Sequence, residues 1–310
     1  MSGVIRTVGG DLPADLAGPV YVHEHLIIDT PLVAETMPHI HLSSVGEALA
    51  EVRMCVASGV RTMVDAMPAA AGRDPERLAR VSVLTGMRII ASTGLHTQRY
   101  YEEVPWTRDE SEERLAERFV ADIEEGIDLH DYRGAVVTRS EAKAGIVKVA
   151  TLGERLSEPE ERLFSAAALT AKSTGAPILT HTEGGLGGMA QIERLTSLGV
   201  DPGCIALSHT DKTPDPGYHA DMLSTGVYLC YDQGLREPES TFALLEAMIE
   251  AGHIERLLLG TDGARRSLWA TLGGSPGLAS LYGDVAGRLG PDMAGMVFET
   301  NPARYLTLRR

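Results

Sequence analysis

The stretch that decides the fold is Gly18-Pro-Val-Tyr-Val-His-Glu-His25, an apolar run that ends in two histidines. Its apolar residues are continuous rather than alternating, which is typical of a β-strand covered on both faces. Further runs of this kind follow along the chain, and each is expected to form a strand. They are Val60–Met67, Arg88–Thr93, Gly145–Ala150, Pro177–Thr182, Cys204–His209, Val227–Asp232 and Arg256–Asp262.

Segments with helical periodicity separate these strands. They are Val45–Ser58, Asp74–Gly86, Asp109–Gly126, Glu158–Thr174, Met189–Leu198, Tyr218–Thr225 and Ser240–Ala251. Strands that alternate with helices indicate a parallel sheet with right-handed crossovers. Eight such units predict a (β/α)8 TIM barrel that forms a single domain over residues 1–310. An open doubly wound sheet is the alternative, but the chain has no G-x-G-x-x-G motif after its first strand and no P-loop motif.

Composition and charge narrow the class of protein. The chain has 310 residues, a formal charge of −15, 44% apolar residues and 23% charged residues, which is typical of a globular protein. The excess of acidic over basic residues weighs against a nucleic-acid partner. No apolar run approaches the length of a transmembrane helix. Cys55, Cys204 and Cys230 are scattered, so a reducing, cytoplasmic location is expected rather than a disulfide framework.

The histidines at the end of the first strand are candidate metal ligands. Period-two alternation places His23 and His25 on one side of the strand and Glu24 on the other. Two imidazoles on one short arc can bind one metal ion, although two hydrogen-bonded barrel histidines would give the same motif. A second H-x-H motif, His39-Ile40-His41, has no strand before it and is expected in a surface loop.

Lys148 lies inside the apolar run Ala144-Gly-Ile-Val-Lys-Val-Ala150, where an unpaired ammonium group would be costly to bury. Three interpretations are open. The side chain could form a structural ion pair, or it could be an amine of lowered pKa that forms a Schiff base. Alternatively, its neutral amine could take up carbon dioxide to form a carbamate that bridges two cations.

Three later strands also end in ligand-type residues, namely His181, His209 and Asp262. Active sites of such barrels lie at the carboxyl ends of the strands, so these side chains are expected to meet the first two histidines there. Imidazole and carboxylate ligands suit Zn²⁺ and similar divalent ions. A pair of such ions can activate a hydroxide and polarise a substrate oxygen.

These residues resemble the phosphotriesterase family of the amidohydrolase superfamily, and the resemblance runs nearly end to end. The stretch Gly18–Leu26 is similar to the opening H-x-H strand of the family, and Ile146–Ala150 to its carboxylated-lysine strand. Later segments are similar to its other ligand strands and to its C-terminal helix. They are His181-Thr-Glu, Leu207-Ser-His-Thr-Asp211, Leu259-Gly-Thr-Asp262 and Asn301-Pro-Ala-Arg304.

The resemblance implies two divalent metal ions, with Zn²⁺ favoured and Mn²⁺ or Co²⁺ as alternatives. It implies that His23, His25 and Asp262 hold the more buried ion, and that His181 and His209 hold the more exposed one. Lys148, carboxylated by carbon dioxide, would bridge the two ions together with a hydroxide. That hydroxide would attack the substrate, and Asp262 would be the catalytic base.

Loops after the third, seventh and eighth strands resemble the sugar-lactonase branch of this family more than its organophosphate branch. Arginines in these loops suit an anionic phosphate or carboxylate through bidentate contacts. The predicted substrate-binding residues are Arg99, Tyr100, Tyr231, Arg236, Arg265 and Arg266.

The leading hypothesis is a binuclear metal-dependent hydrolase that opens a lactone, with sugar lactones and phosphorylated sugar lactones as the candidate substrates. One alternative keeps the metal site but takes a phosphotriester or phosphodiester. A second alternative, of another class, is a non-catalytic barrel that binds a ligand. The expected partner is a small-molecule substrate rather than a nucleic acid or a membrane, and the resemblance leaves a homodimer open.

Overall fold

The computed structural model describes residues 3–309, whose centre is a sheet of eight parallel strands in the order β10-β9-β8-β7-β6-β5-β4-β3. These strands are β3 (Val20–Glu24), β4 (Thr62–Asp65), β5 (Arg88–Gly94), β6 (Ala144–Thr151), β7 (Ile178–Thr182), β8 (Ile205–Ser208), β9 (Tyr228–Tyr231) and β10 (Leu257–Leu259). Each lies within or beside a run predicted from the sequence. The predicted TIM barrel is therefore confirmed.

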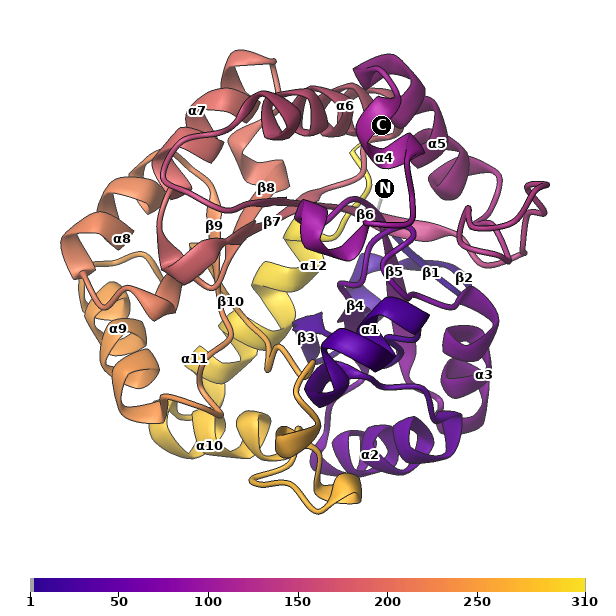
Figure 1. The fold of residues 1–310 in the computed structure, drawn as a ribbon. Coiled ribbons are helices and arrows are strands. Elements are labelled where there is room, and N and C mark those ends of the chain that lie inside the picture. Colours follow the sequence, from indigo (N-terminus) through magenta and orange to yellow (C-terminus); the bar gives the residue numbers. More distant parts are fainter. Residues whose placement is uncertain (1–2, 310) are drawn as a thin grey trace.

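Helices surround the barrel as an outer ring (Figure 1). The ring contains α2 (Val45–Ser58), α3 (Pro75–Thr85), α5 (Glu112–Glu124), α6 (Glu158–Thr174), α7 (Gly188–Ser197), α8 (Pro216–Ser224), α9 (Pro238–Glu250) and α10 (Ser280–Leu289). Shorter helices lie in the connections: α1 (Pro31–Thr36), α4 (Trp106–Asp109), α11 (Pro291–Gly295), a π-helix (Met296–Thr300) and α12 (Asn301–Tyr305). Among residues 3–309, no helix combines the length and the apolar character needed to cross a bilayer.

Local sequence signals fix where the ring helices begin and end. Asp74 accepts a hydrogen bond from the Arg77 backbone N–H at 2.9 Å, and Pro75 occupies the first turn of α3. Helix α6 ends at Gly175, whose φ of 76° is left-handed and costs glycine little. These signals explain why the predicted helix boundaries lie close to the observed ones.

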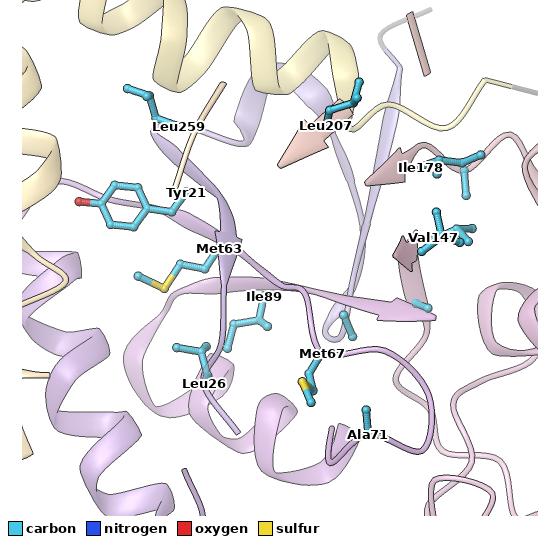
Figure 2. Packing of buried hydrophobic residues seen from close by; sticks show 14 of the residues in the cluster. Tyr21, Leu26, Met63, Met67, Ala71, Ile89, Val147, Ile178, Leu207 and Leu259 are labelled. Carbon is cyan, nitrogen blue, oxygen red and sulfur yellow. The ribbon is translucent and has the colours of Figure 1, made fainter. Parts of the chain in front are cut away.

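Two layers of apolar side chains hold the barrel together. One layer fills the barrel interior, with Val22, Ile146 and Leu179 among its members. The other lies between the strands and the ring helices. Figure 2 shows residues of this outer layer, among them Tyr21, Met63, Ile89, Val147, Ile178, Leu207 and Leu259 from seven strands. Alternation along each strand separates the two layers, as the pleat of a strand requires.

The segments near the two ends of the described chain meet below the barrel. Strands β1 (Val4–Thr7) and β2 (Gly10–Pro13) form an antiparallel hairpin that the sequence analysis did not predict. The Leu308 backbone N–H donates to the Val4 carbonyl at 2.8 Å. Ile5 and Tyr305 pack against the interior layer, so both terminal segments close the amino end of the barrel.

Strands β3 and β10 approach each other closely, and this brings the first and last ligand-type residues together. The Asp262 backbone N–H donates to the His23 carbonyl at 2.9 Å. A Cβ atom on Gly260 would lie 2.7 Å from both the backbone nitrogen and the carbonyl oxygen of His23. Only glycine permits this approach, because those atoms are backbone and cannot move aside.

We therefore predict that Gly260→Ala pushes β10 away from β3 and lowers the free energy of unfolding by about 1–3 kcal/mol. The matched control is Gly283→Ala in α10, where an added Cβ meets nothing within 4 Å and should not destabilise the helix. Thermal unfolding of the wild type and both variants tests this. Equal stability of Gly260→Ala and wild type would show that the close approach is not required.

Candidate metal centre and active site

Four histidines converge at the carboxyl ends of β3, β7 and β8. They form the imidazole cluster, which consists of His23, His25, His181 and His209. Ring centroids lie 5.3 Å apart for His23 and His25, 4.8 Å for His23 and His209, and 4.5 Å for His181 and His209. All four side chains are buried. The strand ends thus bring together imidazoles that are up to 186 positions apart in the sequence (209 − 23).

Asp232 is a functional residue that the sequence analysis missed. It directly follows β9 and is completely buried. Its Oδ2 lies 2.8 Å from His23 Nδ1, and its Oδ1 lies 2.8 Å from His209 Nδ1. A carboxylate on Nδ1 fixes the tautomer of an imidazole and leaves Nε2 free as a ligand atom. Alternation from Tyr228 and Cys230, both in the interior layer, could have indicated that Asp232 also points inward.

Asp262 follows β10 and lies against the imidazole cluster. Its Oδ1 lies 3.5 Å from His25 Nε2 and 3.9 Å from His23 Nε2. Burial acts to raise its pKa, but electrostatic interactions with His209 and Arg236 and a hydrogen bond from His25 hold the pKa well below the ordinary value. The carboxyl group is therefore ionised, as a ligand or a general base must be.

The backbone at two of these positions is unusual. Asp262 has a φ of 45° and His209 a φ of 66°, and both values lie in the left-handed region. Non-glycine residues adopt this conformation rarely, although Asp and His do so more readily than most. At His209 the Asp232 carboxylate also accepts the backbone N–H, at 3.1 Å. Such local strain is typical of side chains aimed at a functional site.

Lys148 is brought to the same place by β6. It is 1% exposed, and its Nζ lies 3.4 Å from His23 Nε2 and 3.2 Å from Ser208 Oγ. Burial lowers its pKa to about 8, against the opposing charges of Asp232 and Asp262. No carboxylate of residues 3–309 forms a direct ion pair with it, which weakens the ion-pair interpretation. At neutral pH a minor fraction of this amine is therefore neutral, more than for an exposed lysine.

The donor atoms in this cluster fit divalent metal ions. One ligand atom each from His23, His25 and Asp262 lies within 4.8 Å of the others. Burial lowers the pKa of His23 to about 3 and the pKa of both His181 and His209 to about 4, so these rings are neutral, as ligands must be. The Nδ1 atoms of His25 and His181 are buried without a hydrogen-bond partner. The carboxylates of Asp262 and Glu183 lie on the Nε2 side of these two rings, 3.5 Å from His25 Nε2 and 3.1 Å from His181 Nε2. Unpaired buried nitrogen atoms suit a cation that takes nitrogen ligands.

A cavity of about 360 Å³ opens above the imidazole cluster. Basic side chains surround it and form the basic rim, which consists of His39, Arg99, Lys212 and Arg265. The apolar part of its wall comes from Ile28, Met37, Ile40 and Met67. Glu183 also lines the cavity, and Arg99 and Lys212 help to lower the pKa of its carboxyl group to about 2. Basic side chains still outnumber this carboxylate on the rim, although the whole chain carries a formal charge of −15. His39 belongs to the second H-x-H motif, which forms a short exposed turn as expected but reaches the cavity.

Three of the predicted substrate-binding residues line this cavity: Arg99, Tyr100 and Arg265. The other three, Tyr231, Arg236 and Arg266, are not part of its lining. Tyr231 is completely buried with its hydroxyl 2.6 Å from His219 Nδ1, because alternation along β9 turns it away from the side that Asp232 faces. Arg266 is half-buried and donates to the His41 carbonyl at 2.9 Å.

Arg236 acts on Asp262 rather than on the cavity. Its Nη2 donates to Asp262 Oδ2 at 3.0 Å and to the carbonyl oxygen of the same residue. Its Nη1 donates to the Asp232 carbonyl at 3.1 Å. One guanidinium group therefore holds the carboxylate of Asp262 and its strained backbone in place. It also lines a neighbouring cavity of about 520 Å³, which shares Lys212 and Arg265 with the first.

Comparison with known proteins agrees with this arrangement. A phospho-furanose lactonase from Mycoplasmopsis agalactiae is 35% identical over 232 residues, which span 74% of this chain and 66% of that protein, slightly under two thirds of its length. The crystal structure of an amidohydrolase from Mycoplasma synoviae superposes with a TM-score of 0.95 at 28% identity, covering 100% of this chain and 93% of that one. A lactonase from Listeria monocytogenes superposes with a TM-score of 0.89 at 25% identity, covering 99% and 100%.

The family comparison is the most direct. The model described as "Phosphotriesterase family" matches residues 3–289, which is nearly the whole chain. The matched region contains every residue of the imidazole cluster, together with Lys148, Asp232 and Asp262. This chain therefore belongs to the phosphotriesterase family.

Proposed function

We propose that this hydrolase is a metal-dependent lactonase that opens a sugar lactone carrying a phosphate or another anionic group. Membership of the phosphotriesterase family makes the chain a hydrolase that acts on ester bonds. The basic rim is the observation that carries the more specific proposal, because it holds more basic side chains than the one carboxylate of Glu183 can neutralise, and a neutral phosphotriester offers them no charge. The relative named phospho-furanose lactonase supports the same substrate class.

Arg99 and Arg265 lie on the rim directly above the imidazole cluster and are the proposed anion-binding residues. A guanidinium group can hold a phosphate through two parallel hydrogen bonds, which fixes orientation as well as position. Tyr100 lies beside Arg99, whose guanidinium carbon is 5.2 Å from the centre of the tyrosine ring. This stacking would hold Arg99 over the cavity before substrate binds.

Two divalent ions fit the proposed centre, with Zn²⁺ favoured and Mn²⁺ or Co²⁺ as alternatives. His23, His25 and Asp262 would hold one ion, and His181 and His209 the other, with Lys148 as a carbamate between them. Such ions lower the pKa of water and polarise an ester oxygen. The neutral imidazoles, the unpaired ring nitrogens and the lowered pKa of Lys148 support this assignment.

The protein side chains would have separate roles in proton transfer, in orientation of the ligands and in alignment of the substrate. Asp262 accepts the proton of the attacking water, and its position beside His25 suits a base at the floor of the cavity. Asp232 orients His23 and His209. Arg236 keeps Asp262 in one place through its hydrogen bonds, and the basic rim aligns the anionic substrate over the floor.

Cysteine chemistry supports the proposed cytoplasmic location. Cys55, Cys204 and Cys230 are all free thiols, and each is buried. Free thiols buried in the core are typical of proteins from reducing compartments. The proposed partner is a small-molecule substrate that enters from the rim side of the barrel.

Removal of metal with a chelator should abolish lactone hydrolysis, and addition of Zn²⁺, Mn²⁺ or Co²⁺ should restore it, because the imidazole cluster has no other electrophile. The measurement is metal content together with turnover of sugar lactones, phosphorylated sugar lactones and phosphotriesters. Turnover of phosphoesters alone would favour the phosphotriesterase alternative. A folded protein with neither metal nor turnover would favour the non-catalytic barrel.

Asp262→Asn should reduce kcat by about 100-fold or more while the protein stays folded, since the amide cannot accept a proton. Circular dichroism and steady-state kinetics check this prediction. Asp284→Asn on the outer helix α10 is the matched control and should behave as wild type. Turnover of Asp262→Asn near the wild-type rate would refute the role of Asp262 as base.

Lys148→Ala should weaken metal binding, because the proposed bridging group is lost. A short carboxylate such as propionate should restore part of the metal content and activity, since it can occupy the space of the carbamate. Metal analysis after dialysis, with and without propionate, makes the comparison. Unchanged metal content in Lys148→Ala would contradict a bridging role.

A further inference from the structure

His96 follows β5 and lines the cavity, yet the proposed mechanism does not use it. Its backbone N–H donates to the Tyr101 hydroxyl at 2.6 Å. Its ring lies edge-on between two neighbours, with centroids 4.6 Å from Tyr100 and 4.7 Å from His181. The residue is 8% exposed, so its ring is held firmly and only a small part of it reaches the cavity.

One hydrogen bond fixes the tautomer of this ring. The Thr97 backbone N–H donates to His96 Nδ1 at 2.7 Å. A backbone N–H can only donate, so Nδ1 must be an acceptor without a proton, and the proton of the neutral ring is on Nε2. Nε2 has no hydrogen-bond partner among residues 3–309 and is not one of their buried unpaired atoms. His96 lines this cavity and a smaller neighbouring one, so its Nε2 is an unpaired N–H donor at the cavity wall.

His96 and Asp262 contact different members of the imidazole cluster. Asp262 lies beside His25 and His23, and its Oδ2 is 3.9 Å from His209 Nδ1. His96 packs on the fourth ring, His181, which neighbours His209. An ester lying over this cluster, with its attacking water beside Asp262, would have its other oxygen atoms directed toward His181 and His96.

We propose that His96 is a further catalytic residue, which donates a hydrogen bond from Nε2 to the leaving oxygen of the lactone. The inference rests on the proposed function. Water adds its oxygen to the carbonyl carbon and gives one proton to Asp262, which passes it to solvent. The carbon–oxygen bond of the ring then breaks, and the leaving oxygen takes a proton from solvent. His96 keeps its own proton and stabilises the negative charge while it develops, as a neutral imidazole can.

The test uses His96→Phe, which keeps an aromatic ring but has no donor, and His96→Gln, whose amide N–H can reach the position of Nε2. Two six-membered lactones differ in the oxygen that leaves the carbonyl carbon when the ring opens. This oxygen becomes an alkoxide in δ-valerolactone and a phenoxide in dihydrocoumarin. A phenoxide needs less stabilisation than an alkoxide. His96→Phe should therefore lose about 100-fold in kcat/KM with δ-valerolactone and much less with dihydrocoumarin. His96→Gln should recover most of this loss.

Metal content of each variant is the second readout and should equal that of the wild type, because His96 is not among the proposed ligands. His253→Phe, on the loop before β10 at the other end of the barrel, is the matched control and should not change kinetics. Equal losses with both lactones, no recovery in His96→Gln, or loss of metal from His96→Phe would each overturn the proposal. If the metal-loaded wild type opens no lactone, the proposed function itself fails, and this inference with it.

Discussion

The two hydrogen bonds from the Asp232 carboxylate to His23 and His209 are the constraint on which the site depends. They join the ends of β3, β8 and β9 and set one tautomer for both rings. Without this carboxylate, two buried imidazoles at 4.8 Å would be free to turn, and their Nε2 atoms would not face a common point. The barrel provides the positions of the side chains, and Asp232 provides their orientation.

Burial then determines the chemistry of the cluster. Removal from water disfavours a charge on His23 and His181, so these rings keep a lone pair at neutral pH, and it lowers the pKa of Lys148 to about 8, so that only a minority of this amine is neutral there. Asp262 stays ionised in the same surroundings because Arg236 and the imidazoles offset the effect of burial. Neutral bases and an ionised carboxylate therefore lie side by side, which is the composition that binds cations and accepts protons.

Much of this could be predicted from the sequence, because strand runs, helix ends and polar residues at strand ends are local signals. The eight strands and the convergence of His23, His181, His209 and Asp262 follow from such signals. The direction of a loop side chain does not, since it depends on tertiary contacts. Arg236 and Arg266 were both predicted to bind substrate because both lie in loops. In the structure Arg236 donates to the Asp262 carboxylate, whereas Arg266 donates to the carbonyl of His41, 225 positions away in the sequence. The hairpin β1–β2 was missed because its strands are short and mostly stabilised by the barrel end beneath them.

The contact between Val4 and Leu308 has a practical consequence. Since these residues are hydrogen-bonded neighbours at the closed end of the barrel, a short linker could join them into a continuous backbone. New chain termini could then be made in a surface loop on the outside of the barrel. The result would be a circular permutant with the same packed interior. A fusion partner or a solid support attached near Val4 or Leu308 would face away from the cavity above the imidazole cluster.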